Sequence, residues 1–378
     1  MTDLGAGRGG PPTAFVEPDE AGPLDLFSSE PGEPQVAESD IDEVTPRELL
    51  GRPSTADRVY QQVTTGAGAT VLVVMLVVGL FLLFRAADAI GTAGWSFLTT
   101  ADWQPQGGTF GIAAILTGTI LVGVTAILLA VPLALGTALY ISEYAPQGIR
   151  RLLINMVDLM AAVPSVVYGL WGVYLLQPQL LIVGPQGEGL PRWLATYLGW
   201  IPFFQVQSAG VRVNASDPAT SGAVFQNSLA IAAVVVALMV APVACSIMRE
   251  SFSQAPVGER EGAFALGSTK WGMIRSVVLP FGTGGIIGGT MLGLGRALGE
   301  TIAVFMILSF AFDVKLRILE SGGSTVSALI ALRFGEASDF GLSALMAAGL
   351  SLFLLTLVVN FGASAIISRS RSGAMSDA

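Results

Sequence analysis

The stretch TVLVVMLVVGLFLLF, residues 70–84, contains no charged side chain and forms the centre of a helix long enough to cross a membrane. Crossing about 30 Å of hydrocarbon takes about 20 mostly apolar residues in a helix. Further such segments follow along the chain. We therefore predict an all-α, polytopic membrane protein with six transmembrane helices, at about 66–84, 110–140, 152–176, 223–247, 286–310 and 343–367. The second is long enough to tilt or to bend at Pro132, and the third carries Pro164 in mid-span; both breaks suggest packing against other helices rather than lipid.

Composition excludes most classes of soluble enzyme. The 378 residues are 52% hydrophobic and 12% charged, against about 25% charged in a soluble domain. The chain has no histidine, the commonest general base, and one cysteine, Cys245, so it lacks the residues for a disulfide framework or the usual structural zinc sites. We expect no cofactor, no metal and no catalytic residues, and an intramembrane enzyme is poorly supported.

The net charge of −9 comes from the N-terminal segment. Residues 1–50 hold 12 acidic and 2 basic side chains among many prolines and glycines, whereas residues 51–378 are nearly neutral. Such a segment cannot bury enough apolar area to offset its ordering entropy. We predict a disordered acidic tail at 1–50, either simply solvated or a regulatory or partner-binding arm, followed by a transmembrane domain at 51–378.

The distribution of Lys and Arg predicts the orientation of the spans. With the N-terminus inside, the cytoplasmic loops carry more than twice the density of basic residues found in the outside loops. Both termini are then cytoplasmic. A further apolar piece, Trp193 to Phe204, is too short to span, and we expect it to be interfacial or re-entrant, anchored by its aromatic residues.

The inside loop at 248–285, between spans four and five, is too long for a simple connector. After Pro256 we expect a short amphipathic helix with Ala263, Phe264 and Leu266 on one side and Glu259, Arg260 and Glu261 on the other. Gly267 permits a sharp turn, and a second amphipathic stretch runs from Trp271 to Leu279 and ends at Pro280. The loop either docks into a groove on another protein or lies on lipid headgroups.

Two opposite charges, Arg296 and Glu300, fall near the middle of the fifth span, four residues apart and so on one helix face. A charge at that depth costs about 3 kcal/mol, so it usually faces a cavity or a partner. The pair is either a structural salt bridge that neutralises itself or pins a neighbouring helix, or Arg296 is the cation of an anion path in which Glu300 limits how deep the electrostatic well becomes. Forked guanidinium donors suit an oxyanion. Glycines at 289/293 and 295/299 would let another helix approach closely.

These features resemble the ABC importer permeases. The inside loop is similar to their EAA motif, which implies coupling to a cytoplasmic ATPase, and the matching residues are Glu261, Gly262, Ala263, Gly267, Val277, Leu279 and Pro280. The segment Gly262–Thr269 has P-loop glycine spacing but lacks its lysine, so ATP hydrolysis is expected in a separate subunit.

Other segments resemble the PstC-type permease subunits of bacterial phosphate importers: Phe110–Ile112, Gly118–Thr119, Ser142–Pro146, Ala161–Gly172 and Gly293–Val304. The resemblance covers about residues 66–367. It implies a pore-forming type I permease of the cytoplasmic membrane that moves inorganic phosphate by alternating access, with Arg296 and Glu300 in its path. It also implies a PstA-like second permease, a PstB-like ATPase dimer and a PstS-like extracytoplasmic binding protein, and no nucleic acid.

Residue chemistry alone leaves other functions open. A permease for sulfate or molybdate would use the same cation, and a stand-alone anion channel or carrier would need no ATPase. Two further acids, Glu143 and Asp158, are expected to be headgroup-level or interhelical hydrogen-bonding groups, and Cys245 a small apolar residue.

Overall fold

The computed structural model describes residues 54–184, 188–208, 210–217 and 220–372. The acidic segment 1–50 therefore lies outside the described residues. Within them, four helices are long and apolar enough to cross a membrane, and the number rises to six if each of two bent helix pairs is counted as one span. The expected all-α membrane architecture is confirmed.

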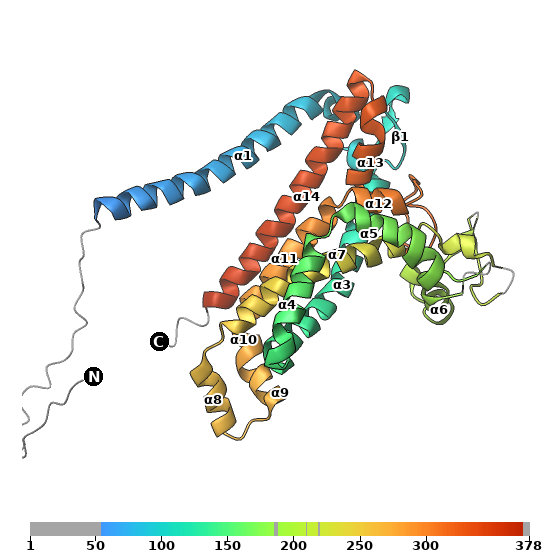
Figure 1. Ribbon diagram of the computed structural model, residues 1–378. Coiled ribbons are helices and arrows are strands. Elements are labelled where there is room, and N and C mark those ends of the chain that lie inside the picture. Colours follow the sequence, from blue (N-terminus) through green and yellow to red (C-terminus); the bar gives the residue numbers. More distant parts are fainter. Residues whose placement is uncertain (1–53, 185–187, 209, 218–219, 373–378) are drawn as a thin grey trace, which may run out of the picture. The chain divides into compact units, whose positions relative to one another are not determined.

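The candidate membrane spans are formed mainly by the following helices (Figure 1). They are α1 (Thr55–Ala93), α3 (Ala113–Leu139), α4 (Gln147–Ala162), α5 (Ser165–Trp171), α7 (Leu229–Ser253), α11 (Thr283–Gly299) and α14 (Asp339–Ser372). Three π-helical segments extend or join them: η2 (Tyr140–Tyr144), η3 (Gly172–Leu181) and η6 (Ile274–Val278).

Shorter elements fill the connections. The short helices are α2 (Ser96–Thr99), α6 (Leu190–Tyr197), α8 (Val257–Ala265), α9 (Lys270–Met273), α10 (Leu279–Phe281), α12 (Ile302–Ile307) and α13 (Val326–Arg333). The 3₁₀ turns are η1 (Pro105–Gly107), η4 (Pro202–Phe204), η5 (Gly222–Phe225) and η7 (Phe334–Glu336). Two antiparallel hairpins pair β1 (Trp103–Gln104) with β2 (Thr109–Phe110) and β3 (Gln207–Ser208) with β4 (Val211–Arg212).

Helix α7 lies at the centre of the core and packs against α3, α4 and α11. Small side chains allow this close packing. On α3 they recur at four-residue spacing and are at most 1% exposed: Ala126, Ala130, Ala134 and Ala138. By contrast, α1 buries only two of its described residues, Ala86 and Ala89, and leaves its apolar window uncovered by the rest of the described chain.

The first bend interrupts the third predicted span. Helices α4 and α5 meet at 90°, with Pro164 between them. Val163 leaves the helix with ψ 130°, as expected for a residue before proline. The sequence correctly marked Pro164 as a break, although Pro132 lies inside the unbroken helix α3.

The predicted bounds of the fourth span, 223–247, are about six residues too early, because α7 begins at Leu229. Asn227 causes the shift: it has a φ of +52°, outside the helical region. Its side-chain Nδ2 donates to the Ile307 carbonyl at 2.7 Å, and its backbone N–H donates to Gln177 Oε1 at 3.3 Å. These contacts hold a turn where the sequence suggested helix.

The predicted fifth span, 286–310, is not one helix. Helix α11 ends at Gly299, and α12 begins at Ile302. At its other end α11 follows the segment Lys270–Phe281 at an angle of 64°. The chain therefore bends where it enters this span and breaks again at Glu300, beside the residues of the candidate path.

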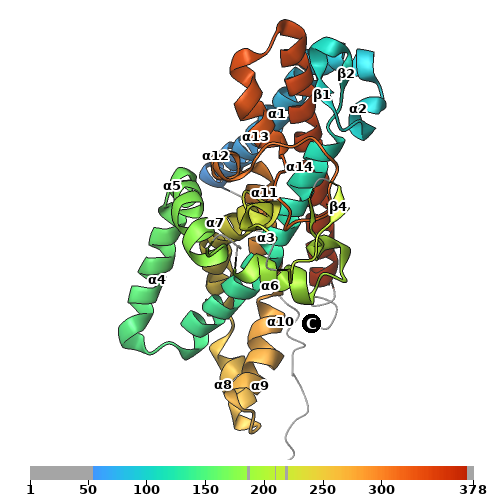
Figure 2. The same cartoon turned by 90° about the vertical axis from the view of Figure 1, so that its right-hand side faces the viewer.

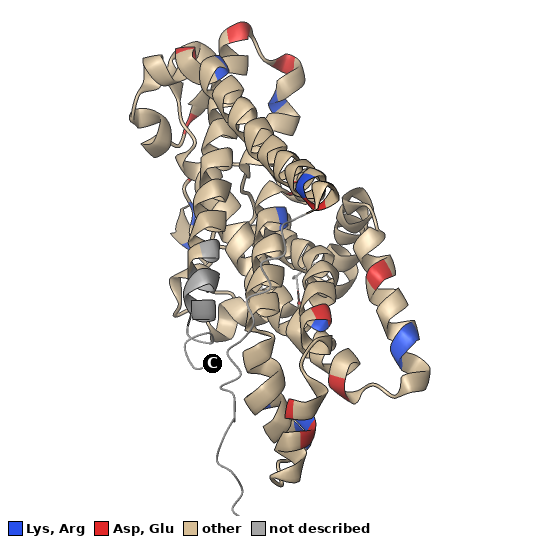
Figure 3. Cartoon of the chain, turned by 90° about the vertical axis from the view of Figure 1, so that its left-hand side faces the viewer, with Lys and Arg blue, Asp and Glu red and all other residues tan. Residues whose placement is uncertain are grey.

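The two ends of the region Gly66–Ala378 differ. Helices α8 and α9 form a knob at one end, and β1, β2 and α13 lie at the opposite end (Figures 1 and 2). Figure 3 shows long stretches of helix without a charged residue, with most charges in loops and near helix ends. The predicted interfacial piece is the short helix α6 followed by η4, and its aromatic residues Trp193, Tyr197 and Trp200 are exposed.

Candidate functional site

Arg296 lies in the last turn of α11, and its side chain is exposed on the surface of this chain. In the part of the chain that the structure describes, it forms no hydrogen bond or ion pair, and none of the salt bridges there joins it to Glu300. The interpretation of the two residues as a self-neutralising salt bridge is therefore wrong. The permanently charged guanidinium of Arg296 is therefore exposed on this face of the chain.

Glu300 does not share a helical face with Arg296, as a continuous helix would have placed it. Its ψ of 127° takes it out of α11, and its Oε1 accepts the N–H of Ala303 at 3.2 Å. A carboxylate that accepts a first-turn amide satisfies a donor that has no partner within the helix. This contact explains the break: Glu300 caps α12, so the helix restarts after it.

Tyr168 is a further residue near Arg296 that the sequence did not single out. It lies on α5, close enough to the guanidinium for an electrostatic interaction. Its hydroxyl donates to the carbonyl of Met160 at 2.9 Å, across the bend at Pro164. The bend and the cation are thus linked through one side chain, a relation that only the folded chain reveals.

The two glycine pairs of α11 serve different faces. A Cβ at Gly293 would lie 2.7 Å from Val240, and one at Gly289 would lie 3.0 Å from the Ala244 carbonyl, so this pair lets α11 pack against α7. A Cβ at Gly295 or Gly299 would meet nothing within 4 Å. The predicted close approach of a helix is confirmed for the first pair, and the second faces open space.

The inside loop forms a helix–turn–helix knob. Helix α8 ends at Ala265, and Gly267 makes the turn with a φ of +83°, a conformation that favours glycine. Thr269 then caps α9 by accepting the N–H of Gly272 at 3.1 Å. The predicted turn at Gly267 is confirmed, and Glu261 and Gly262 lie exposed on α8.

The predicted division of α8 into two sides is wrong in part, because Ala263 and Arg260, placed on opposite sides, both face the helices. Phe264 and Leu266 are 46% and 89% exposed, whereas Arg260 turns towards the helices. Ala263 alone of the predicted apolar side packs against the buried cluster beneath. The apolar tip therefore points away from the chain's own core. Leu279 packs against that core and Pro280 is exposed at the start of the next bend.

Arg260 forms an ion pair with Glu143 of η2, with 3.3 Å between Nη1 and Oε1. The Glu143 side chain is 4% exposed. The sequence suggested that Glu143 is either a headgroup-level or an interhelical acid, and the contact shows the latter. Arg260 was missed, because its partner lies more than 100 residues away along the chain.

Asp158 also joins two helices. Its Oδ1 accepts the hydroxyl of Ser246 at 3.0 Å, which ties α4 to α7. Cys245, beside that serine, is a free and buried thiol, in keeping with the small apolar role expected of it.

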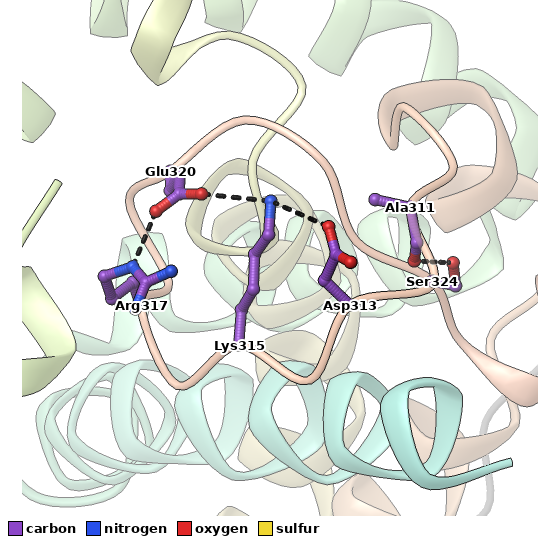
Figure 4. A network of polar contacts seen from close by, with 6 residues as sticks. All are labelled: Ala311, Asp313, Lys315, Arg317, Glu320 and Ser324. Carbon is purple, nitrogen blue, oxygen red and sulfur yellow. Dashed lines mark hydrogen bonds and ion pairs between the residues drawn. The ribbon is translucent and has the colours of Figure 1, made fainter. Parts of the chain in front are cut away.

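The sequence analysis did not predict the polar network of the loop between α12 and α13 (Figure 4). Glu320, on the loop between α12 and α13, is 8% exposed. Its Oε2 accepts from Arg317 Nε at 2.6 Å and its Oε1 lies 3.0 Å from Lys315 Nζ. Burial by itself raises the pKa of Glu320, but the hydrogen bonds and charges of Arg317 and Lys315 outweigh it and hold the pKa below its ordinary value.

The chain matches the family model of the binding-protein-dependent transport system inner membrane components over residues 130–372. The chain belongs to this family. The family places it in the inner membrane as a multi-pass transport component, with the apolar helices described above.

Among proteins of known name, the chain is similar to phosphate transport permeases. The chain is 37% identical over 314 residues to "Phosphate transport system permease protein PstC 2" of Mycobacterium tuberculosis, which covers 82% of this chain and 91% of that protein. It is 35% identical over 301 residues to PstC of Pasteurella multocida, covering 80% and 88%. The resemblance to PstC-type permeases is confirmed for this inner membrane component.

A solved structure shares the fold. A bacterial alginate ABC transporter, in complex with an alginate pentasaccharide-bound periplasmic protein, matches with a TM-score of 0.53 over 82% of this chain and 96% of that chain. At 15% identity, the match shows a common ABC importer permease fold.

Proposed function

We propose that the chain is the pore-forming permease subunit of an ATP-driven importer of inorganic phosphate, which works by alternating access. The observation that carries this proposal is the identity of 37% to a phosphate transport system permease over 82% of the chain. The geometry adds an exposed guanidinium, which offers forked donors to an oxyanion.

Arg296 is the proposed anion-binding group of the path. Its charge is permanent, and in the described residues no carboxylate neutralises it by contact. Glu300 is held at the break by Ala303 and limits the attraction from a distance, since tight capture would oppose release. The helix break itself fits a path, because non-helical backbone at membrane depth is tolerated where it lines a cavity or packs against protein.

The coupling loop, defined by Glu261, Gly262, Ala263, Gly267, Leu279 and Pro280, is the proposed contact with a cytoplasmic ATPase dimer. The exposed tip formed by Phe264, Leu266 and Trp271 supplies apolar area for a groove on that partner. The chain itself then carries no catalytic residue, and ATP hydrolysis belongs to the partner.

The remaining partners and the orientation follow from the same proposal. A second, similar permease packs on the open side of α11 at Gly295 and Gly299, and an extracytoplasmic phosphate-binding protein delivers the substrate. Both termini are cytoplasmic, as the distribution of Lys and Arg predicts, with residues 1–50 a separate acidic tail before the transmembrane domain at 51–378.

Competition between oxyanions tests the substrate. Cells that depend on this chain for uptake are given radiolabelled phosphate with an excess of unlabelled phosphate, sulfate or molybdate. We expect only unlabelled phosphate to reduce the signal. A signal that excess sulfate or molybdate reduces as strongly as unlabelled phosphate does would instead assign the permease to another oxyanion.

A further inference from the structure

Two neighbouring residues at the end of α3 each hold one helix of the coupling loop. Glu143 forms the ion pair with Arg260 of α8 at 3.3 Å. The ring of Tyr144 lies under the ammonium of Lys270 of α9, at 4.7 Å from its centroid. Both residues belong to η2, the π-helical segment that ends this span. The loop is therefore attached through two cations to one short piece of backbone.

Breaking the Glu143 contact is costly because the carboxylate is buried. Ser142 Oγ also donates to its Oε1, at 2.8 Å, so the oxygen that pairs with Arg260 holds a second contact. Removing one member of a buried ion pair leaves the other uncompensated, which costs far more than breaking an exposed pair. The neighbouring acids Glu259 and Glu261 are exposed, and no described residue forms an ion pair with either.

Arg260 joins three elements at one point. Besides Glu143, its Nη2 donates to the Phe252 carbonyl at 2.5 Å, near the end of α7. A displacement of α8 therefore acts on the ends of both α3 and α7.

Helix α3 extends from this point to the candidate path. A Cβ at Gly123 of α3 would lie 2.6 Å from the Leu298 side chain of α11, so this side chain packs directly on the α3 backbone, two residues along from Arg296. Further along, the Ile127 side chain of α3 would lie 3.2 Å from a Cβ at Gly293. The span formed by α3 and η2 thus touches the coupling loop at one end and the helix of the cation in its middle.

We propose that Glu143 and Arg260, supported by Tyr144 and Lys270, are positioning residues that transmit the movement of the coupling loop to α3 and from there to Arg296. This inference rests on the proposed function. It predicts that the pair affects how much phosphate moves per ATP, while the docking of the ATPase depends on the exposed tip.

The test compares Glu143→Gln, Arg260→Gln and the double variant in the full complex, reconstituted in liposomes. ATP hydrolysis and phosphate accumulation are both measured, together with the amount of ATPase that co-purifies. We expect each single variant to lower the ratio of phosphate moved to ATP hydrolysed at least tenfold with the ATPase still bound. The double variant should be no worse than either single variant, because the two side chains act as one unit.

Glu259→Gln, on the exposed side of the same helix, is the matched control and should keep the wild-type ratio. Tyr144→Leu removes the weaker contact at a half-exposed position, and we expect a loss of two- to fivefold. An unchanged ratio in either single variant of the buried pair would overturn the inference, and so would loss of the ATPase on purification. A wild-type complex that moves no phosphate would instead contradict the proposed function.

Discussion

At the scale of single residues, the chemistry of the proposed path rests on the geometry of one side chain. A guanidinium presents planar, forked donors, whereas an ammonium presents a point charge. Arg296 is exposed at the end of α11 beside Tyr168, and Glu300 faces the amide of Ala303. The cation is thus available to an anion, while the nearest acid along the chain is occupied.

Arg296→Gln should reduce phosphate uptake by more than a hundredfold, because it removes the charge while keeping similar length. Arg296→Lys should retain a few per cent of uptake, since a point charge lacks the planar fork. Uptake by cells carrying each variant, with the protein quantified in isolated membranes, checks both. Arg333→Gln, at another partly exposed arginine, is the control. Normal uptake in both Arg296 variants would assign this residue a structural role.

Glu320 predicts a dependence of loop stability on pH. The pKa of Glu320 is lowered in the folded chain, so its charge stabilises the loop fully at any pH above the ordinary glutamate pKa. This contribution is lost as the pH falls from there through the lowered pKa. Protease cleavage in residues 308–325 should therefore increase below about pH 4.5. Glu320→Gln should be cleaved readily at every pH, and Glu336→Gln, at an exposed acid, should behave as wild type. Acid dependence that persists in Glu320→Gln would contradict this.

At the scale of elements, the coupling loop depends on one residue whose backbone is in the left-handed conformation. Gly267 has a φ of +83°, and a Cβ there would meet nothing within 4 Å, so backbone strain alone would oppose a larger residue. Gly258, which is not one of the residues that define the coupling loop, lies within α8 with equally open surroundings. The two glycines therefore form a matched pair of test positions.

Gly267→Val should strain the turn by about 1–2 kcal/mol and lower uptake at least fivefold with normal amounts of protein in the membrane. Gly258→Ala should keep uptake and improve the helix by up to about 1 kcal/mol. Uptake assays and co-purification of the ATPase check both variants. Equal uptake in Gly267→Val and wild type would show that the turn geometry is not needed for coupling.

The sequence predicted those elements whose signals are local. Apolar length found the spans, Pro164 marked a bend, and Gly267 marked a turn. The break at Glu300 was missed although its contact with Ala303 is local, because the sequence treats Glu300 as the partner of Arg296 on one helix face. The start of α7 was missed because contacts between distant residues set it. Asn227 donates to Ile307, for example, across 80 positions of sequence.

The two sides predicted for α8 were wrong for a related reason. The sequence placed Arg260 on the side opposite Ala263, but Arg260 pairs with the buried carboxylate of Glu143 and Ala263 packs on the cluster beneath, so both face the helices. Phe264 and Leu266 are exposed. Site residues of opposite charge on different spans could be paired only once the helices were placed together.

At the scale of the whole molecule, several apolar surfaces are uncovered. The apolar window of α1 is not buried by other described residues, and Gly295 and Gly299 face open space. Lipid covers apolar side chains well, but a stripe of small residues favours close contact with another helix. The open stripe at Gly295 and Gly299 supports the proposal that the chain is one subunit of a larger membrane assembly.

Gly295→Leu and Gly293→Leu should separate assembly from folding. The first adds a side chain in open space, so we expect a folded subunit that fails to co-purify with the second permease. The second would place a Cβ 2.7 Å from Val240 and should reduce the amount of the chain itself in the membrane. Quantified membrane fractions and pull-downs check both. A Gly295→Leu variant that assembles normally would place the second subunit elsewhere.

The most direct measurement of the central claim is ATP-dependent accumulation of radiolabelled phosphate in liposomes that contain the purified complex. The proposed function predicts accumulation against the gradient when ATP, the ATPase and the binding protein are all supplied, and none when ATP is replaced by a non-hydrolysable analogue. Phosphate that crosses at the same rate through this chain alone, without ATPase or ATP, would contradict it and indicate a channel or carrier.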